Sequence, residues 1–409
     1  MSKINELINK LCPDGVRYNK LSEIGNQFSG LSGKSKKDFE NGNCKYITYT
    51  NIYNNPSTNL DVEDYVQVKE NEKQNEIKYK DILVAGSSEN LEDSGMISVV
   101  TKEPNEKIYL NSFCFGFRLN DIFYDKYNPD FLKHLFRDKN FRNEIISCSF
   151  GVTRYNLSKE KFLKIKIPCP PLEIQEEIVR ILDKFGELEA ELEEELEARK
   201  SQYEFWRTNL LNNYKELKTV KDVLIKYCSG ATPLKGNAAF YEGGTIPWLR
   251  TQEVRFNEIN HTECFVTEVA LEKTGIKFIP ENCVIVAMSG ASAGRCAINK
   301  IPLTTNQHCL NLEVDPNKAN YKYVYYCICN AYGELLSKKE GARGDLNSSK
   351  IVNLKIPMPS LEIQNKIVSV LDKFDKLIND IAVGLPAEIE LRRKQYEYYR
   401  NKLLSFKEI

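Results

Sequence analysis

The chain has 409 residues, 42% of them hydrophobic and 28% charged, which is typical of a globular protein with room for two or three domains. Its 57 basic and 57 acidic residues cancel, which excludes a uniformly basic nucleic-acid coat but allows a local basic groove. No apolar run reaches the roughly 20 residues that a membrane-spanning helix needs, and no signal-peptide pattern opens the chain, so we expect a cytoplasmic protein with no membrane partner.

The first globular part, residues 1–170, is predicted to be rich in strands. Residues 46–51 form one strand-like run, and residues 81–87 form an apolar run that ends in a small-residue loop. A third characteristic segment lies at 111–114, and a short helix is expected at 130–138. We therefore predict a β-rich domain with some helix.

A long helix is predicted for residues 171–214. After Pro171, apolar residues recur at alternating steps of four and three, which is the seam of a coiled coil. Acidic residues crowd positions 187–197, with no basic residue among them. At 1.5 Å per residue, about 40 residues would give a helix roughly 60 Å long.

The second globular part, residues 215–358, repeats the first. Its segments 247–252, 283–289 and 306–309 correspond to the three segments named above, and a helical pattern follows at 321–336. The shared order of elements with different loop sequences suggests one scaffold that serves two readers of different targets.

A second helical segment, residues 359–409, ends the sequence. Its apolar seam is interrupted at Gly384-Leu385-Pro386. Because proline removes a helical hydrogen bond, we expect a kink or break there, with Pro386 restarting the helix.

The two helical segments carry nearly identical motifs. These are Ile-Pro-x-Pro-x-Leu-Glu-Ile-Gln at 167–175 and 356–364, Leu-Asp-Lys-Phe at 182–185 and 371–374, and Gln-Tyr-Glu at 202–204 and 395–397. Each copy is domain-sized, far longer than a solenoid repeat of roughly 20–50 residues. The two helices most simply pair with each other in an antiparallel manner, which would bring the acidic run near residues 392–394. The alternative is that each helix packs on its own globular domain.

The expected fold class is therefore α+β. Two similar β-rich domains are separated by a pair of long antiparallel coiled-coil helices, and the whole forms an internal repeat with pseudo-two-fold symmetry.

No catalytic or metal-binding pattern stands out. Gly33-Lys34-Ser35 lacks the earlier glycine that a phosphate-binding loop requires, because Phe28 stands at that position. The 12 cysteines are scattered without a Cys-x-x-Cys pair, so reduced and mostly buried thiols are expected. His261 with Cys264, and His308 with Cys309, would each supply half of a zinc site whose second half is missing.

The duplicated motifs, with Leu-Cys-Pro-Asp-Gly-Val at 11–16 and Gly-Leu-Pro at 384–386, resemble the specificity subunit of type I restriction–modification systems over essentially the whole chain. This resemblance implies two target recognition domains, each reading one half of a bipartite double-stranded DNA target. It also implies two methyltransferase subunits docked on the helical frame, and restriction subunits where the system has them. Catalysis, S-adenosylmethionine and ATP would belong to those partners, with no cofactor in this chain.

Side chains that read DNA bases are expected on loops that recur in both halves. Arginine suits guanine, asparagine suits adenine, and serine or threonine suits either. The three loop sets are Thr50 and Asn51 with Arg250 and Thr251; Ser87 and Ser88 with Ser289, Ser292 and Arg295; and Thr153, Arg154 and Tyr155 with Arg343. Phosphate contacts, which position the protein without specifying sequence, are predicted for Lys34, Lys36, Lys37 and Lys235. The alternative for each residue is an ordinary polar loop position.

Two other functions stay open. A fused nuclease or methyltransferase would need catalytic motifs that the sequence lacks. A protein-binding coiled-coil scaffold without base-specific DNA recognition would fit the zero net charge and the acidic helix. Two variable domains on an invariant frame are hard to explain by scaffolding alone.

Overall fold

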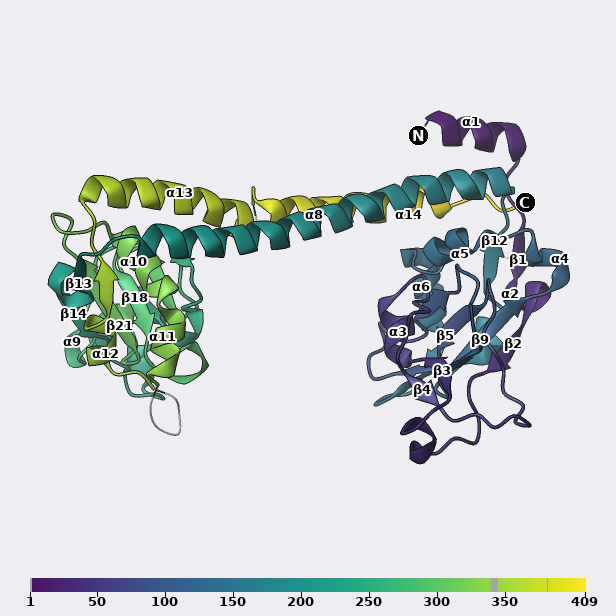
Figure 1. Ribbon diagram of the computed structural model, residues 1–409, viewed down its shortest axis with the longest axis horizontal. Helices are drawn as coiled ribbons and strands as arrows, with labels where there is room; N and C mark the ends of the chain where they lie inside the picture. The colour runs from purple at the N-terminus through teal and green to yellow at the C-terminus, as the bar shows by residue number, and fades with distance from the viewer. Residues whose placement is uncertain (1, 340–344, 381) are drawn as a thin grey trace. The chain divides into compact units, whose positions relative to one another are not determined.

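The computed structural model describes residues 2–339, 345–380 and 382–409 (Figure 1). The chain divides into two compact units: the first is Met1–Glu193 with Ile389–Ile409, and the second is Glu194–Glu388. Each unit combines one globular domain with part of the helical segments. Among the described residues, no helix combines the length and the apolar character that crossing a membrane would require.

The core of the first unit is built on a four-stranded antiparallel sheet in the order β2-β9-β5-β7. Its strands are β2 (Gly25–Ser29), β5 (Ile82–Ala85), β7 (Ile97–Val99) and β9 (Cys114–Leu119). Alternate residues of β5 enter two different cores, Ile82 and Val84 on one face and Leu83 and Ala85 on the other. A strand buried on both faces is apolar throughout, so the predicted strand at 81–87 is confirmed.

Three smaller sheets complete the first unit. The first contains β4 (Tyr65–Val66), β3 (Cys44–Ile47) and β8 (Ile108–Leu110). The second contains β10 (Ser149–Phe150), β11 (Tyr155–Leu157) and β6 (Ser87–Ser88). The third pairs β1 (Tyr18–Lys20) with β12 (Lys166–Pro168). The helices are α1 (Ser2–Leu11), α2 (Leu21–Ile24), η1 (Lys36–Phe39), α3 (Tyr49–Asn54), α4 (Asp121–Tyr124), α5 (Pro129–Leu135), α6 (Lys139–Ser147) and α7 (Lys159–Phe162).

The second unit repeats this arrangement. Its main sheet has the order β14-β21-β18-β19, extended by β16, and β18 again divides its residues between two cores. The strands are β13 (Leu217–Thr219), β14 (Leu224–Ser229), β15 (Ile246–Leu249), β16 (Glu258–Ile259), β17 (Phe265–Val266), β18 (Val284–Ala287), β19 (Cys296–Asn299), β20 (Thr304–Thr305), β21 (Cys309–Val314) and β22 (Lys355–Pro357). The helices are η2 (Val220–Val223), η3 (Ala238–Phe240), η4 (Thr251–Glu253), α9 (Glu268–Lys273), η5 (Gly290–Ser292), α10 (Tyr321–Asn330), α11 (Tyr332–Ser337) and α12 (Ser348–Val352).

One predicted pair of strands is shorter than expected. In the first unit β3 ends at Ile47, and Thr48 then caps helix α3 by accepting a hydrogen bond from the backbone N–H of Asn51. In the second unit β15 ends at Leu249 and the short helix η4 follows. The β-favouring residues of 46–51 suggested a longer strand, but the N-cap threonine turns the chain into a helix.

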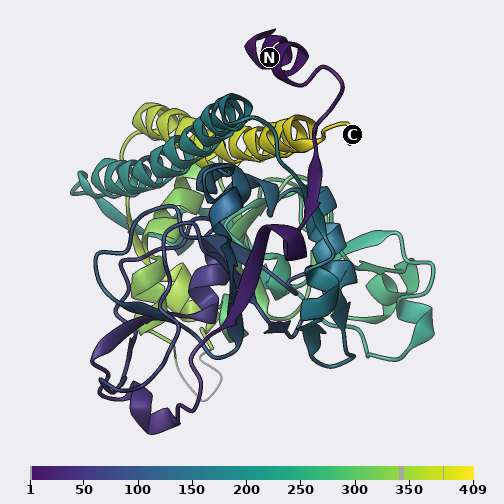
Figure 2. The ribbon, with the colours of Figure 1, turned by 90° about the vertical axis from the view of Figure 1, so that its right-hand side faces the viewer.

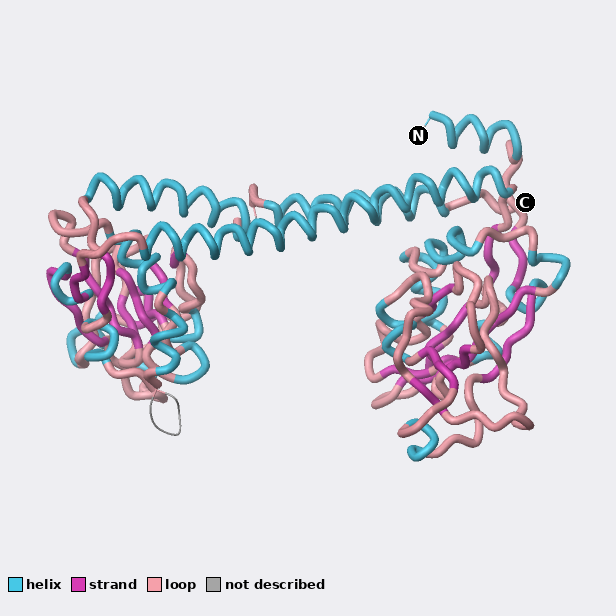
Figure 3. The backbone as a smooth tube through the Cα atoms, in the orientation of Figure 1, coloured by secondary structure: helices cyan, strands magenta, loops and turns pink. Residues whose placement is uncertain are grey.

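The long helical segments are α8 (Leu172–Asn212), α13 (Leu361–Asn379) and α14 (Leu385–Leu404), drawn among the cyan coils of Figure 3. Helix α13 ends before the Gly-Leu-Pro step and α14 begins at Leu385, so the predicted break is confirmed. Its physical cause is the proline, which cannot continue the preceding hydrogen-bond ladder.

Within the first unit, α8 and α14 pack side by side and run antiparallel. Phe185 stacks on Tyr399 at 5.2 Å between ring centres, while Arg393 binds Glu189 and Glu193 further along α8. The acidic run therefore meets a basic residue of the last helix, as predicted. In the second unit, α8 faces α13, where Tyr203 lies 6.3 Å from Phe374.

Both chain ends belong to the first unit (Figure 2). Helix α1 packs Ile4 into the same core as Ile174 of α8, and Lys3 pairs with Glu177 at 2.9 Å. The C-terminal residues close onto the segment after α1, because the N–H of Val16 donates to the carbonyl of Lys407 over 2.7 Å.

The repeated glutamine joins each long helix to its globular domain. In the first unit, the side-chain oxygen of Gln175 accepts from the backbone N–H of Asn128 at 2.8 Å, and its amide donates to Lys126 and Pro170 carbonyls. In the second unit, Gln364 accepts from the N–H of Asn320 at 2.9 Å. Asn128 and Asn320 are the N-caps of α5 and α10. Each repeated glutamine therefore links a long helix to the start of a helix in the globular domain, and we call Gln175 and Gln364 the joint glutamines.

Candidate nucleic-acid interface

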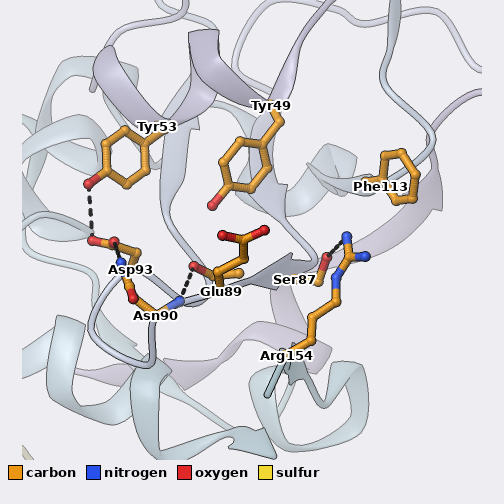
Figure 4. Close-up of a pocket in the computed structure, with 9 residues that line it drawn as sticks. Tyr49, Tyr53, Ser87, Glu89, Asn90, Asp93, Phe113 and Arg154 are labelled. Atoms are coloured by element: carbon orange, nitrogen blue, oxygen red, sulfur yellow. Dashed lines mark hydrogen bonds between the residues drawn. The ribbon is translucent and has the colours of Figure 1, made fainter. Parts of the chain in front are cut away.

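Strand pairing brings two of the predicted loops of the first unit together. β6 pairs with β11, placing Ser88 opposite Tyr155 and Ser87 opposite Asn156. Helix α3, which carries the third predicted loop set, supplies the facing wall (Figure 4). Residues of two predicted loop sets, Ser87, Ser88 and Arg154, therefore line one concave pocket together with Tyr49 and Tyr53 of α3, whereas Thr50 and Asn51 of the remaining set do not line it.

The pocket has a volume of about 340 Å³. Its lining comprises Tyr49, Tyr53, Ser87, Ser88, Glu89, Asn90, Asp93, Phe113 and Arg154. We call it the recognition pocket. Tyr49 and Tyr53 present stacked rings with centres 6.3 Å apart, and Figure 4 shows Arg154 and Ser87 together at another side of the pocket. The lining thus mixes aromatic faces with groups that donate and accept hydrogen bonds.

Arg154 is exposed and is oriented by two contacts. Its Nη2 donates to Ser87 Oγ at 3.1 Å, and its guanidinium carbon lies 5.5 Å from the ring centre of Phe113. Phe113 is itself 61% exposed, so the aromatic ring supports the guanidinium without enclosing it. Since arginine has five N–H donors and one bonds to Ser87, the others can reach guanine or a phosphate.

The other polar groups of the pocket are held by one carboxylate. Tyr53 Oη donates to Asp93 Oδ1 at 3.1 Å, and Asn90 Nδ2 donates to Asp93 Oδ2 at 3.1 Å. The hydrogen bond to Asp93 is the main reason that the pKa of Tyr53 lies above its usual value, so the phenol stays protonated. Glu89 is exposed beside them and offers acceptor oxygens, which suit the amino group of cytosine.

Two predicted contacts of the first unit point inward. Asn51 is buried, and its Nδ2 donates to the carbonyl of Asn59 at 2.8 Å. Lys34 Nζ donates to the carbonyl of Gln67 and to Glu72, each at 2.6 Å. The hydrogen bond from Lys34 is the largest cause that lowers the pKa of Glu72 to about 2. The amide of Asn51 and the ammonium of Lys34 are therefore engaged internally, as expected of structural residues.

Ser88 is buried as well, and its Oγ accepts from the backbone N–H of Asn90 at 3.1 Å, whereas the other predicted residues of the first unit are at least partly accessible. Thr50 on α3 and Thr153 beside Arg154 are exposed, and Tyr155 is half-buried. Lys36 and Lys37 lie exposed in η1, away from the lining of the recognition pocket. The positions of Lys36 and Lys37 suit phosphate contacts, which need a free ammonium group and no fixed geometry.

In the second unit, the predicted residues are more dispersed. Arg250 is held by Glu263, with Nη2 to Oε2 at 2.6 Å, and Thr251 begins the adjoining η4. Ser289 is the N-cap of η5, Ser292 ends it, and both are half-buried with Arg295 beside them. Lys235 is exposed. Arg343 lies outside the described residues.

Sequence reasoning missed the aromatic part of the recognition pocket. Tyr49 and Tyr53 are one helical turn apart, a relationship hidden because residues 46–51 resemble a strand. Phe113 could not be found by side-chain alternation either, because it lies in the turn before β9, which begins at Cys114. Glu89 and Asp93 carry no local signal beyond their polar loop.

Among the residues that the structure describes, no group of three or more His, Cys, Asp or Glu side chains is placed to hold a metal ion. His261 and His308 of the predicted half-sites are exposed. All twelve cysteines are free thiols.

Both halves of the chain match one family model. Residues 13–198 and 201–391 match the type I restriction modification DNA specificity domain. The type I restriction enzyme EcoR124I/EcoR124II specificity subunit of Escherichia coli is 39% identical over 257 residues, covering 59% of this chain and 63% of that relative. The chain thus aligns with somewhat less than two thirds of that protein. A putative type I restriction enzyme specificity subunit, S.HindORF215P of Haemophilus influenzae, is 31% identical over 300 residues, covering 69% and 73%.

Solved structures share the fold. A chain from work on complex assembly and conformational transition of the type I R-M system aligns with a TM-score of 0.66 and 16% identity, covering 96% of this chain and 98% of that chain. The HsdS subunit from Thermoanaerobacter tengcongensis aligns with a TM-score of 0.53 and 16% identity, covering 96% and 97%. At these identities the likeness concerns the architecture.

Proposed function

Because the chain belongs to the family of type I restriction–modification specificity subunits, we propose that each of its globular domains reads one half of a bipartite double-stranded DNA target. The observation that carries this proposal is the duplicated scaffold with unlike loops. The main sheets have the same strand order, yet a two-residue strand at Ser87–Ser88 in one unit corresponds to a short helix at Gly290–Ser292 in the other.

In the first unit, the recognition pocket would carry the sequence-dependent contacts. Arg154 would donate to guanine or to a phosphate, and Glu89 would accept from an amino group in the major groove. The stacked pair of Tyr49 and Tyr53 offers flat apolar surface against which a thymine methyl or a sugar can pack. The exposed lysines Lys36 and Lys37 would fix the domain on the backbone.

In the second unit, different chemistry would read the other half. Arg295 follows the η5 loop and, in the described part of the chain, pairs with no carboxylate, whereas Arg250 is bound to Glu263. We therefore favour Arg295, Ser289 and Ser292 as base contacts there, with Lys235 on a phosphate. Arg250 would have to exchange Glu263 for DNA before it could contribute.

The long helix would set the gap between the two half-sites. Helix α8 has 41 residues, which corresponds to about 60 Å at 1.5 Å per residue. Half-sites read on one face of DNA lie roughly 34–36 Å apart or multiples of that distance. A helical spacer of this length can hold two readers at such a separation.

Two methyltransferase subunits would dock on the duplicated helical frame. Phe205 of α8 and Tyr398 of α14 hold the same place in the Gln-Tyr-Glu repeat and are 61% and 60% exposed. Each meets its neighbour edge-on, Phe205 with Trp206 at 5.6 Å and Tyr398 with Tyr399 at 5.3 Å. A duplicated exposed aromatic pair is what two copies of one partner would bind.

Chemistry would belong to those partners in the cytoplasm. Adenine methylation from S-adenosylmethionine, and ATP-driven cleavage where restriction subunits are present, would take place outside this chain, which needs no cofactor for recognition. Its own residues would bind and orient DNA.

Selection from a randomised duplex pool by the reconstituted complex tests the proposed function. Enrichment of two short sequence blocks around a fixed gap would support it. Enrichment of a single undivided block, or of no sequence while the complex is assembled and active in methyl transfer, would overturn it in favour of a protein-binding scaffold.

A further inference from the structure

A second cavity of the first unit is distinctly basic. It has a volume of about 610 Å³, within the range of roughly 300–1,000 Å³ that is usual for small-molecule sites. Its lining comprises Asn55, Pro56, Ser57, Met96, Lys133, His134, Arg137, Arg142, Tyr396 and Arg400. These residues come from the loop after α3, from the residue before β7, from α5, α6 and the turn between them, and from α14.

Three arginines bring positive charge to this cavity without carboxylate partners. Within the described part of the chain, no carboxylate lies at ion-pair distance from Arg137, Arg142 or Arg400. The acidic groups nearby are already engaged, since Asp183 binds Lys133 and His134 at 2.9 and 2.8 Å. The cavity therefore carries a net positive charge.

One donor in this cluster is buried and unsatisfied. The Nε of Arg400 has no hydrogen-bond partner, and its guanidinium carbon stands 4.9 Å from the ring centre of Tyr396. Burial, with the charges of Arg142 and Arg400, lowers the pKa of Arg137 to about 10. A buried N–H without an acceptor and a buried charge without a counter-ion both destabilise the fold, so an anion that accepted from Arg400 would relieve both penalties.

Two of these arginines, Arg137 and Arg142, also hold the walls of the recognition pocket. Arg137 Nη2 donates to the carbonyls of Ile52 and Tyr53 at 2.9 and 3.2 Å. Arg142 donates to the carbonyls of Glu92, Ser94 and Gly95 in the loop that also contains Asp93. Tyr53 and Asp93 line the recognition pocket, so the two cavities share their supports.

The second unit lacks this basic cluster at the equivalent place. His134 bonds Asp183 in the first unit, and Tyr326 bonds the equivalent Asp372 in the second. Three residues after His134 stands Arg137, whereas three residues after Tyr326 stands Cys329. The repeat places Arg207 where the first unit has Arg400, and its Nε is likewise buried without a partner, with the guanidinium carbon 5.2 Å from the ring centre of Tyr203. At the place of Arg137, however, Cys329 Sγ lies 3.3 Å from the buried Cys296 Sγ. Two thiols thus occupy the place of the Arg137 guanidinium. The helical segments are duplicated but the basic cluster is not, so docking of one kind of partner on both units does not explain the basic cavity.

We propose that the cavity formed by Arg137, Arg142 and Arg400 is a phosphate-binding site that exists in the first unit alone. Arg400, whose Nε has no partner, would donate to the phosphate, while Arg137 and Arg142, whose Nη2 groups are bonded to backbone carbonyls, would match its charge. The volume leaves room for a sugar attached to the phosphate. Occupancy would order Arg137 and Arg142, and through their carbonyl contacts both walls of the recognition pocket.

Calorimetric titration of the full-length chain with inorganic phosphate tests the site. Chloride salt keeps the ionic strength constant throughout the titration. We expect one phosphate per chain in the wild type and at least tenfold weaker binding by Arg400→Met. The matched control is Arg207→Met in the second unit, which should bind phosphate as the wild type does. No phosphate binding by the wild type, or equal losses in both variants, would overturn the proposal.

Folding of each variant is checked by its thermal melting curve. Should Arg400→Met fail to fold, Arg400→Gln replaces it, because the amide keeps a polar group beside Tyr396 without the charge. The same tenfold loss is expected from that variant. Wild-type affinity in a folded Arg400→Gln protein would contradict the site.

Two further titrations distinguish the sources of the phosphate. If the DNA backbone supplies it, the complex saturated with target duplex no longer binds inorganic phosphate, and Arg400→Met lowers the slope of log affinity against log salt by about one. If a free phosphate compound supplies it, phosphate binding persists with DNA bound and the slope is unchanged. Phosphate binding by the chain alone does not depend on half-site reading, so failure of the site and failure of the proposed function give separate results.

Discussion

Arg154 and Ser87 stand 67 positions apart in the sequence, yet Arg154 Nη2 donates a hydrogen bond to Ser87 Oγ over 3.1 Å. The pairing of β6 with β11 brings these two loops together, and α3 closes the pocket from the other side. The sequence-dependent contacts that we propose for the first unit therefore centre on one guanidinium.

Replacing that guanidinium should affect one half-site. Arg154→Ala is expected to reduce discrimination at one or two base pairs of one block by about 1–3 kcal/mol, or roughly fivefold to 150-fold. The other block should be read as before. Binding of the reconstituted complex to duplexes with single base changes in either block measures both effects.

Val152→Ala serves as the neighbouring control, because Val152 is 86% exposed and does not line the recognition pocket. It should leave discrimination in both blocks near the wild-type value. Equal loss of discrimination in both blocks by Arg154→Ala would refute modular reading.

The joint glutamines should govern the stability of each unit separately. Gln175→Leu leaves the N–H of Asn128 and the carbonyls of Lys126 and Pro170 without their partner. We expect a loss on the order of 3 kcal/mol in the opening free energy of this region, because each unsatisfied buried group costs about 1–3 kcal/mol. Hydrogen exchange read by mass spectrometry should show faster exchange in α5 and the start of α8.

Gln364→Leu is the matched variant of the second unit. It should accelerate exchange in α10 and α13 and leave α5 unchanged, since the two glutamines share no partner. Faster exchange in both units from either single variant would show that the joints are not independent.

Acidification should destabilise the first unit through His134. Burial lowers the pKa of His134 below its usual value, although the hydrogen bond to Asp183 opposes this shift. The unfolded chain then binds the proton at a higher pH than the folded chain, so stability is lost as the pH falls through about 6.5. His134→Gln removes this titration while it keeps a donor toward Asp183.

The measurement is the exchange of α5 amides at pH values on either side of about 6.5, corrected for the intrinsic exchange rate. The wild type should lose protection on acidification, and His134→Gln should lose less. Helix α10 is the internal control because Tyr326 stands there in place of the histidine. Burial and the hydrogen bond to Asp372 raise the pKa of Tyr326, so this side chain does not titrate at a pH of about 6.5. An identical pH response in His134→Gln and the wild type would exclude His134 as the cause.

The exposed aromatic pairs should decide how many methyltransferase subunits assemble. Phe205→Ala and Tyr398→Ala alter equivalent places of the two units, with rings 61% and 60% exposed. Each single variant should lower the mass of the complex by one methyltransferase subunit at concentrations where the wild type binds two. Native mass spectrometry distinguishes these species, and an unchanged stoichiometry in the double variant would remove the aromatic pairs from the interface.

The helical frame could be predicted because its signals are local and periodic. The apolar steps indicate α8, and the Gly-Leu-Pro step separates α13 from α14 at the place where proline cannot donate. The buried strands β5 and β18 were equally visible, since a strand covered on both faces is apolar at every position.

The recognition pocket could be predicted only in part because its geometry depends on distant partners. Ser87 and Arg154 were expected as contacts and do line the pocket. Lys34 looked like a free cation, but its partner Glu72 lies 38 positions away. Asn51 looked like an adenine reader, but its amide satisfies the backbone of Asn59. No local pattern shows which polar side chains the fold will use internally.

Genome-wide mapping of adenine methylation tests the central claim most directly. Three strains are compared: one with the intact gene, one without it, and one with Arg154→Ala, with expression of the partner subunits verified in each. We predict that one bipartite motif, two short blocks around a fixed gap, disappears without the gene, and that Arg154→Ala relaxes a single block of it. An unchanged methylome after deletion, or relaxation of both blocks in the variant, would contradict the account.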